Sequence, residues 1–174
     1  GETIVFPLLP FLIERFTNSG STLGLLAGTY AISQFAVAPL IGALSDRFGR
    51  KPVIIICVLG SVIGLSLFAL TISINWQSIL PSAFIGVPLV FLFLSRVIDG
   101  ISVGTAATAT AILADISTPE NRAKTFGLIG VAFGLGFLLG PGLGTTLAKF
   151  SVTLPVWAAT AFAIANLALV VFIL

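Results

Sequence analysis

Histidine is absent from this chain, cysteine occurs once, and only 8% of its 174 residues are charged. The lack of histidine excludes histidine-based metal sites, catalytic triads and histidine proton relays. Because Cys57 is alone, no disulfide can form within the chain, and we expect this residue to be a small buried hydrophobe. We also find no nucleophile elbow and no phosphate-binding loop. The sequence therefore predicts no catalytic residues, no metal site and no enzyme.

The shortage of charge also excludes an ordinary soluble domain, in which about 25% of the residues are charged. Hydrophobic residues make up 57% of the chain, and its mean hydropathy is +1.20. The net charge of +2 does not indicate a nucleic-acid partner, because the basic residues lie beside apolar segments and form no basic face. Their positions suit the anionic surface of a lipid bilayer. We therefore predict an integral membrane protein that contacts lipid and binds no nucleic acid.

Five apolar segments are long enough to cross a bilayer, which takes about 20 residues in a helix. They lie at about 22–44, 52–73, 83–113, 124–148 and 154–174, and a shorter one at about 2–13 is expected to belong to a truncated first helix. The predicted fold class is all-α, a polytopic transmembrane bundle of six helices with the first one truncated. A capping box, Ser117 to Glu120, is expected to start the fifth helix.

The basic residues are distributed unevenly between the two ends of these helices. The turns after the second and fourth helices hold Arg47, Arg50, Lys51, Arg122 and Lys124, whereas the opposite ends hold Arg15 and Lys149. Cytoplasmic loops of membrane proteins carry the excess of lysine and arginine. We therefore expect the first group to face the cytoplasm, and the turns after the first, third and fifth helices to face outward.

The most distinctive segment is the loop from Gly42 to Lys51, a dense group of charges between two uncharged stretches. Its glycines permit a tight turn and a close approach of helices. Asp46 can pair with Arg47 or Arg50, or lie at the positive N-terminus of another helix. Breaking such a contact on one side of the membrane would act as a gate; the alternative is a charged loop that only fixes topology. The predicted gating residues are Gly42, Asp46, Arg47, Gly49, Arg50 and Lys51.

Charges within the fourth helix are the second distinctive feature. Arg96 and Asp99 are three residues apart, so they share a helix face and can pair. Charges at this depth are costly and face the protein interior or a wet cavity. Arginine keeps its proton at physiological pH, so Arg96 would act by tuning a neighbouring acid; the alternative is an ion pair that only makes the helix insertable. Together with Glu2, in the truncated first helix, these two are the predicted proton-coupling residues.

Two further helices carry unusual residues. The fifth contains closely spaced small residues and a Gly-Pro kink that let membrane helices pack closely, namely Gly127, Gly136, Gly140, Pro141 and Gly144. In the second helix, Tyr30 and Gln34 are four residues apart on one face, where polar groups need partners or a cavity. These two are predicted either to line a cargo cavity or to form hydrogen bonds between helices.

These segments resemble motifs of the major facilitator superfamily. The loop from Gly42 to Lys51 resembles the signature between the second and third helices of that family. Arg96 with Gly100 resembles the motif linked to proton coupling, and the glycines of the fifth helix resemble the motif of drug/proton antiporters. Two positions depart from the family pattern: Asp99 stands where many members have glutamine, and Thr145 stands where the antiporter motif ends in glycine.

Through Tyr30, Gln34 and Pro39, the chain looks most like the tetracycline-exporter-like group. The resemblance implies that residues 1–174 are the N-terminal six-helix domain of a secondary transporter in the bacterial inner membrane. A C-terminal six-helix half of the same polypeptide, or a second copy, would complete it. A small lipophilic or amphiphilic cargo would leave as protons enter, driven by the proton gradient without a cofactor. The alternatives are a facilitator or proton symporter for a small solute, and a non-transporting scaffold or sensor of the same fold.

Overall fold

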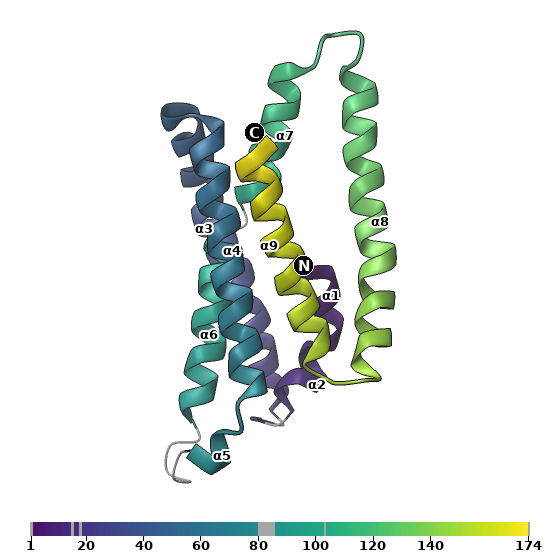
Figure 1. Cartoon of the computed structure of the whole chain (residues 1–174). Helices are drawn as coiled ribbons and strands as arrows, with labels where there is room; N and C mark the ends of the chain where they lie inside the picture. Colours follow the sequence, from purple (N-terminus) through teal and green to yellow (C-terminus); the bar gives the residue numbers. More distant parts are fainter. Residues whose placement is uncertain (1, 15, 18, 80–85, 103, 174) are drawn as a thin grey trace.

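The computed structural model of the chain describes residues 2–14, 16–17, 19–79, 86–102 and 104–173, and within these ranges every regular element is a helix (Figure 1). The helices are α1 (Glu2–Val5), the 3-10 helix η1 (Phe6–Leu8), α2 (Leu9–Ile13), α3 (Gly20–Phe48), α4 (Arg50–Ser73), α5 (Trp76–Ile79), α6 (Gly86–Ile101), α7 (Gly104–Ile116), α8 (Arg122–Ala148) and α9 (Leu154–Ile173). The all-α class predicted from the sequence is therefore confirmed.

Five of the described helical segments are long and apolar enough to cross a membrane, as predicted. They are α3, α4, the segment Gly86–Ile116 that contains α6 and α7, α8, and Leu154–Phe172 of α9. The apolar segment before them consists of the short helices α1, η1 and α2. Pro7 and Pro10 lie in this segment, and each lacks the N–H that would continue a helical hydrogen-bond ladder.

The segment from Gly42 to Lys51 is not the loop that the sequence predicts. α3 continues to Phe48 and α4 begins at Arg50, so only Gly49 separates the two helices. Gly49 has a φ of 94°, a conformation that glycine adopts without a Cβ penalty. Around Gly42, no atom of the described residues lies within 4 Å of the place of a Cβ, so the close helix approach predicted there is not made within this bundle. One glycine reverses the chain, and the charges of this segment therefore lie on helix ends.

The capping box predicted before the fifth span does not form. The N-cap residue of α8 is Asn121, which makes no side-chain hydrogen bond to the helix. The Ser117 hydroxyl donates instead to the carbonyl of Leu113, in the preceding helix. Hydrogen bonds with its own backbone and with the Thr118 side chain lower the pKa of Glu120. Both side chains of the expected box are therefore engaged elsewhere.

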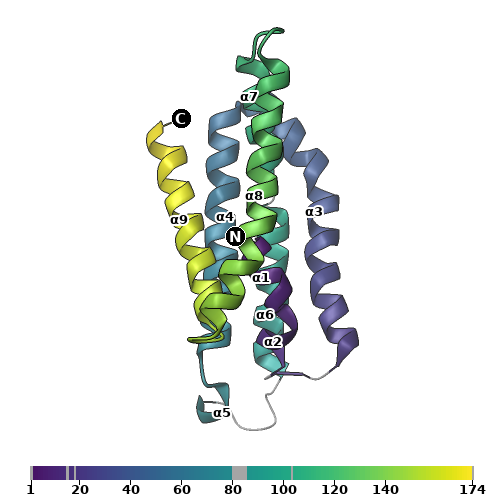
Figure 2. The same cartoon turned by 90° about the vertical axis from the view of Figure 1, so that its right-hand side faces the viewer.

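The helices pack in two unequal groups. α4 packs along both α6 and α9, and α3 packs along α6, which makes these four helices the densest part of the bundle. α8 stands apart from α3 and α4 in Figure 1. It contacts α1, which lies alongside it in Figure 2, and α9. The largest apolar cluster joins residues of α1, α2, α3, α4, α6 and α9, with Leu12, Phe68 and Leu92 fully buried. The N-terminal segment is thus held between the dense group and α8.

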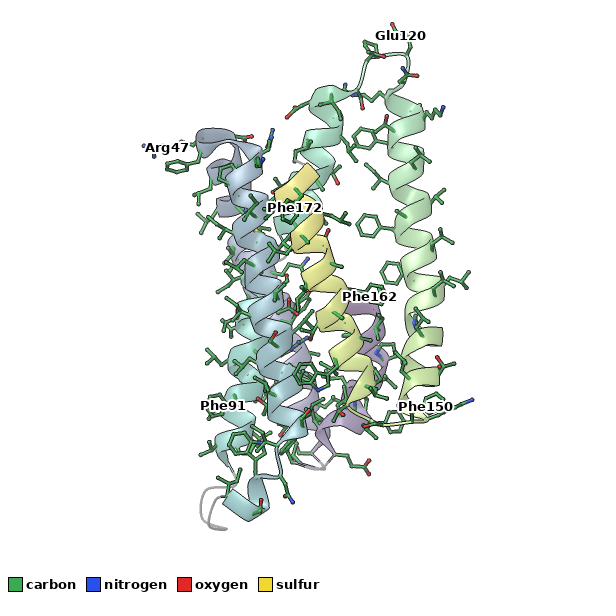
Figure 3. The ribbon with its side chains drawn as sticks, viewed as in Figure 1. Arg47, Phe91, Glu120, Phe150, Phe162 and Phe172 are labelled. Carbon is green, nitrogen blue, oxygen red and sulfur yellow. The ribbon has the colours of Figure 1, made fainter. Side chains whose placement is uncertain are left out.

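The turns alternate between the two ends of the bundle. Arg47, in the last turn of α3, and Glu120, between α7 and α8, lie at one end, whereas Phe150, between α8 and α9, lies at the other (Figure 3). This arrangement gathers the basic residues of both turns at the same end, as the charge pattern predicts. We name this end of the bundle the basic end, and its position on the cytoplasmic side stays a prediction.

Candidate functional site

α6 places two opposite charges inside the bundle. The side chains of Arg96 and Asp99 are each 3% exposed, and Nη2 of the guanidinium lies 3.5 Å from Oδ2 of the carboxylate. The pairing follows from their spacing, because residues three apart in a helix lie on one face. Charges removed from water need compensating protein groups around them, and the neighbouring helices must supply these groups.

Two aromatic rings flank the Arg96 guanidinium. Its Cζ lies 4.6 Å from the ring centroid of Phe68 on α4 and 5.9 Å from that of Tyr30 on α3. Ring faces attract a cation at such distances. Of the two residues predicted to line a cavity, Tyr30 therefore lies against Arg96, whereas Gln34 is half-buried one turn further along α3 and its role stays a prediction. Phe68 is a residue that sequence reasoning missed, because nothing in the sequence distinguishes one of the 15 phenylalanines of this chain from the others.

Two glycines bring α3, α4 and α6 together around the charged pair. A Cβ at Gly64 on α4 would lie 3.0 Å from the backbone nitrogen of Asp99. A Cβ at Gly100 on α6 would lie 2.7 Å from the backbone oxygen of Tyr30. Any larger residue at these positions would force the helices apart, since a backbone atom cannot move aside as a side chain can. The helices that carry the charges and the rings are thus fixed at close range.

Glu2, the third predicted proton-coupling residue, is the first residue of α1, and its side chain lies outside the described part of the structure. α1 lies beside α8, so the N-terminal segment and the fifth span are neighbours (Figure 2). The contact is close, because a Cβ at Gly140 of α8 would lie 2.7 Å from the Cβ of Thr3. The role of Glu2 in coupling stays a prediction.

The glycines predicted to pack α8 closely divide into two sets. Like Gly140, Gly144 faces α1, and its Cβ would lie 2.7 Å from the backbone oxygen of Ile4. Gly127 and Gly136 have no described atom within 4 Å of the place of a Cβ, so close packing within this bundle is not their role. Pro141 lies within α8, beside the closely packed pair. Within the described bundle, close packing is therefore made by the part of α8 that contacts α1.

At the basic end, Arg50 of α4 joins three helices. Its Nη1 lies 2.8 Å from Oδ1 of Asp46 and donates a 2.7 Å hydrogen bond to the Ser45 hydroxyl, both on α3. Its Nε lies 3.2 Å from Oδ2 of Asp115, in the last turn of α7. The Asp46 and Asp115 side chains are 67% and 60% exposed, so each ion pair contributes little and can break and re-form. The pairing of Asp46 with Arg50 agrees with the sequence analysis.

The other predicted gating cations do not join this cluster. Arg47 is exposed, and its guanidinium lies 5.5 Å from the ring centroid of Phe48; Lys51 is exposed as well. Asp115 was the residue missing from the prediction, because sequence reasoning treats an acid at a helix end as a topological group. Its position along the chain could have identified it, because Asp115 precedes the turn between α7 and α8, which must lie at the same end of the bundle as Arg50.

The whole chain, residues 1–174, matches the Major Facilitator Superfamily. It is 37% identical to the tetracycline resistance protein, class C, of Escherichia coli, over all of this chain and 41% of the relative. It is 34% identical to multidrug resistance protein 2 of Bacillus subtilis (strain 168), over all of this chain and 40% of the relative. Quinolone resistance protein NorA of Staphylococcus aureus (strain N315) is also 34% identical, over 94% of this chain and 39% of the relative.

Among solved structures, the human organic anion transporter MFSD10 (TETRAN) superimposes with a TM-score of 0.75 and 31% identity, over 97% of this chain and 42% of that one. The chain thus spans about two fifths of the length of the relatives it matches. A family of transporters rather than enzymes fits the five apolar helices of spanning length among the described residues, which make this a multi-pass membrane protein. On the match over its full length, the chain belongs to the Major Facilitator Superfamily.

Proposed function

We propose that this chain is the N-terminal half of a secondary transporter that exports a small lipophilic or amphiphilic molecule in exchange for protons. Relatives named for resistance to tetracycline, to quinolones and to several drugs support export. The observation that carries the proton step is the pair of Arg96 and Asp99, both 3% exposed within an apolar span. Ionisable residues inside a membrane are costly and mark ion or proton pathways. The bacterial relatives support a place in a bacterial plasma membrane.

In this proposal Asp99 carries the proton and Arg96 keeps its own, because arginine does not deprotonate in proteins. The ionised carboxylate attracts the guanidinium, and proton uptake removes that attraction. The pair is surrounded by a ring from α3, a ring from α4 and glycine contacts to both helices. A change of charge at this point therefore alters the forces on three helices at once, which can bias the bundle toward one of two arrangements. Glu2 is the second candidate proton carrier.

The cluster of Arg50, Asp46 and Asp115 is the proposed gate at the basic end. Its ion pairs hold α3, α4 and α7 together on that side, and their exposure makes them breakable. The other wall of the pathway would come from a C-terminal six-helix half or from a second copy of this chain. Two such halves can rock about a central site and open it to each side in turn.

The test uses the polypeptide that contains this chain, reconstituted in proteoliposomes, with tetracycline as the probe. Flux is measured with and without a pH gradient for the wild type, Asp99→Asn and Glu2→Gln. We expect at least one of these substitutions to lower gradient-driven flux about tenfold or more while flux down the probe's own gradient persists. Glu120→Gln, which changes an exposed acid outside the spans, is the matched control. Full gradient-driven flux in both Asp99→Asn and Glu2→Gln would overturn the assignment of the proton carriers.

A further inference from the structure

The Arg96 guanidinium is buried against an aromatic ring that does not titrate. Phe68 on α4 is 0% exposed, and the guanidinium Cζ lies 4.6 Å from its ring centroid. The surroundings of the ring are apolar, because Phe68 belongs to the cluster that also contains Leu65 and Leu92. The electron-rich face of a ring stabilises a cation most strongly when water is excluded, as it is here.

The ring and the carboxylate differ in one respect that matters for a proton cycle. Asp99 stabilises the guanidinium only while it is ionised, so the proposed proton uptake removes that contribution. The face of Phe68 keeps its charge distribution in both protonation states. A buried cation needs compensating groups in both protonation states of its neighbour. Phe68 supplies a contribution that persists when Asp99 is neutral.

We propose that Phe68 is a positioning residue, which holds the Arg96 guanidinium at the contact between α4 and α6 in both protonation states of Asp99. The inference rests on the proposed function for its role in transport, but the contact itself can be tested without transport. Tyr30 is the weaker of the two flanking rings, since its centroid lies 5.9 Å from the same carbon atom. Phe68 also links Arg96 to α4, whereas Arg96 and Asp99 share α6.

The experiment replaces Phe68 with phenylalanines that carry an increasing number of ring fluorines. Fluorine withdraws electron density from the ring face and changes ring size little, so it weakens attraction for a cation without emptying the core. The same fluorinated phenylalanines in place of Phe162, which is 57% exposed on α9 (Figure 3), serve as the matched control. A Phe68→Leu variant removes the ring face altogether and keeps an apolar side chain.

The melting temperature of the full polypeptide in detergent is measured in two backgrounds, the wild type and the double variant Arg96→Gln/Asp99→Asn. We expect each added fluorine at position 68 to lower the melting temperature in the wild type and to have no graded effect in the neutral background. The same graded loss in both backgrounds, or none in the wild type, would overturn the inference. The double variant keeps the net charge of the pair unchanged, so an unpaired buried charge does not complicate the comparison.

Flux in proteoliposomes is the second measurement, with tetracycline as the probe. We expect gradient-driven flux to fall in steps with fluorination, to about a tenth of the wild-type rate in the most fluorinated protein, while downhill flux is kept. Fluorination at Phe162 should change neither. Unchanged gradient-driven flux in the most fluorinated protein and in Phe68→Leu would overturn the role in coupling. A wild type without gradient-driven flux would instead contradict the proposed function, and the melting temperatures would then decide the role of Phe68 by themselves.

Discussion

Arg50 is one side chain that ties three helices together, which makes its loss a sharp test of the proposed gate. Each of its two ion pairs is partly exposed, so Arg50→Gln should cost no more than about 1 kcal/mol of stability. The same free energy shifts an equilibrium between closed and open ends about fivefold. Thr108→Cys provides a reporter, because Thr108 on α7 is 3% exposed. A water-soluble maleimide should label this cysteine several times faster when Arg50 is replaced.

The matched control for that experiment is Arg47→Gln. Arg47 has the same charge and lies at the same end, but it stacks on Phe48 of its own helix and joins no other helix in the described contacts. Arg47→Gln should leave the labelling rate unchanged. The buried Cys57 is present in every variant, so any labelling of it is the same background in all of them. Equal acceleration by both substitutions would mean that net charge at this end, and not the cluster of Arg50, controls access.

At the scale of single residues, short spacing along the chain predicts contacts between near neighbours. The pairing of Arg96 with Asp99 within α6 follows from a separation of three residues, and that of Asp46 with Arg50, across the reversal at Gly49, from a separation of four. Phe68 and Asp115 reach the same arginines from other helices, and nothing in the local sequence specifies those crossings. Contacts across helices depend on where each helix lies, which the apolar pattern of a membrane segment leaves open.

At the scale of helices, two glycines of α8 allow a direct comparison. Gly144→Ala places a Cβ 2.7 Å from the backbone oxygen of Ile4, so α1 and α8 must separate. We expect a loss of about 1–3 kcal/mol of stability, measured by chemical unfolding in detergent micelles. Gly136→Ala, in the same helix, meets no described atom within 4 Å and should be neutral or stabilising by up to about 1 kcal/mol. If the two variants unfold alike, the contact of α1 with α8 is not formed.

The length and apolar character of the five spans could be predicted because a bilayer imposes both. The ends of the helices were less predictable than the spans. Charged residues were expected to form a loop between Gly42 and Lys51, but they continue α3 and α4 up to a single reversal at Gly49. A capping pattern was expected to start α8, but Ser117 bonds to the preceding helix. In both cases several local arrangements satisfy the same residues, and the neighbouring helices select one.

At the scale of the molecule, the bundle leaves long apolar surfaces uncovered. In the most apolar stretch of each span, 6% of the residues are buried in α3 and in α8, against 44% in α4. The exposed side chains on these two helices include Phe35 at 85% and Leu138 at 73%. Some of this surface suits lipid, but Gly127, Gly130 and Gly134, which share one face of α8, present bare backbone, which favours close contact with another helix over contact with lipid chains. The uncovered faces thus support a further helical partner.

The partner proposed here is a second six-helix half, and the intact mass of the polypeptide extracted from its native membrane tests it. The chain has a mass of 18.0 kDa and covers 41% of its class C tetracycline-resistance relative. A polypeptide that carries both halves should therefore be at least about twice as heavy as this chain, because two similar bundles are needed to enclose one pathway. A native mass near 18.0 kDa would remove the covalent second half. In that event, native mass spectrometry in detergent should find a dimer, because one bundle alone leaves the faces of α3 and α8 uncovered. A stable monomer of that mass would contradict the transporter proposal itself.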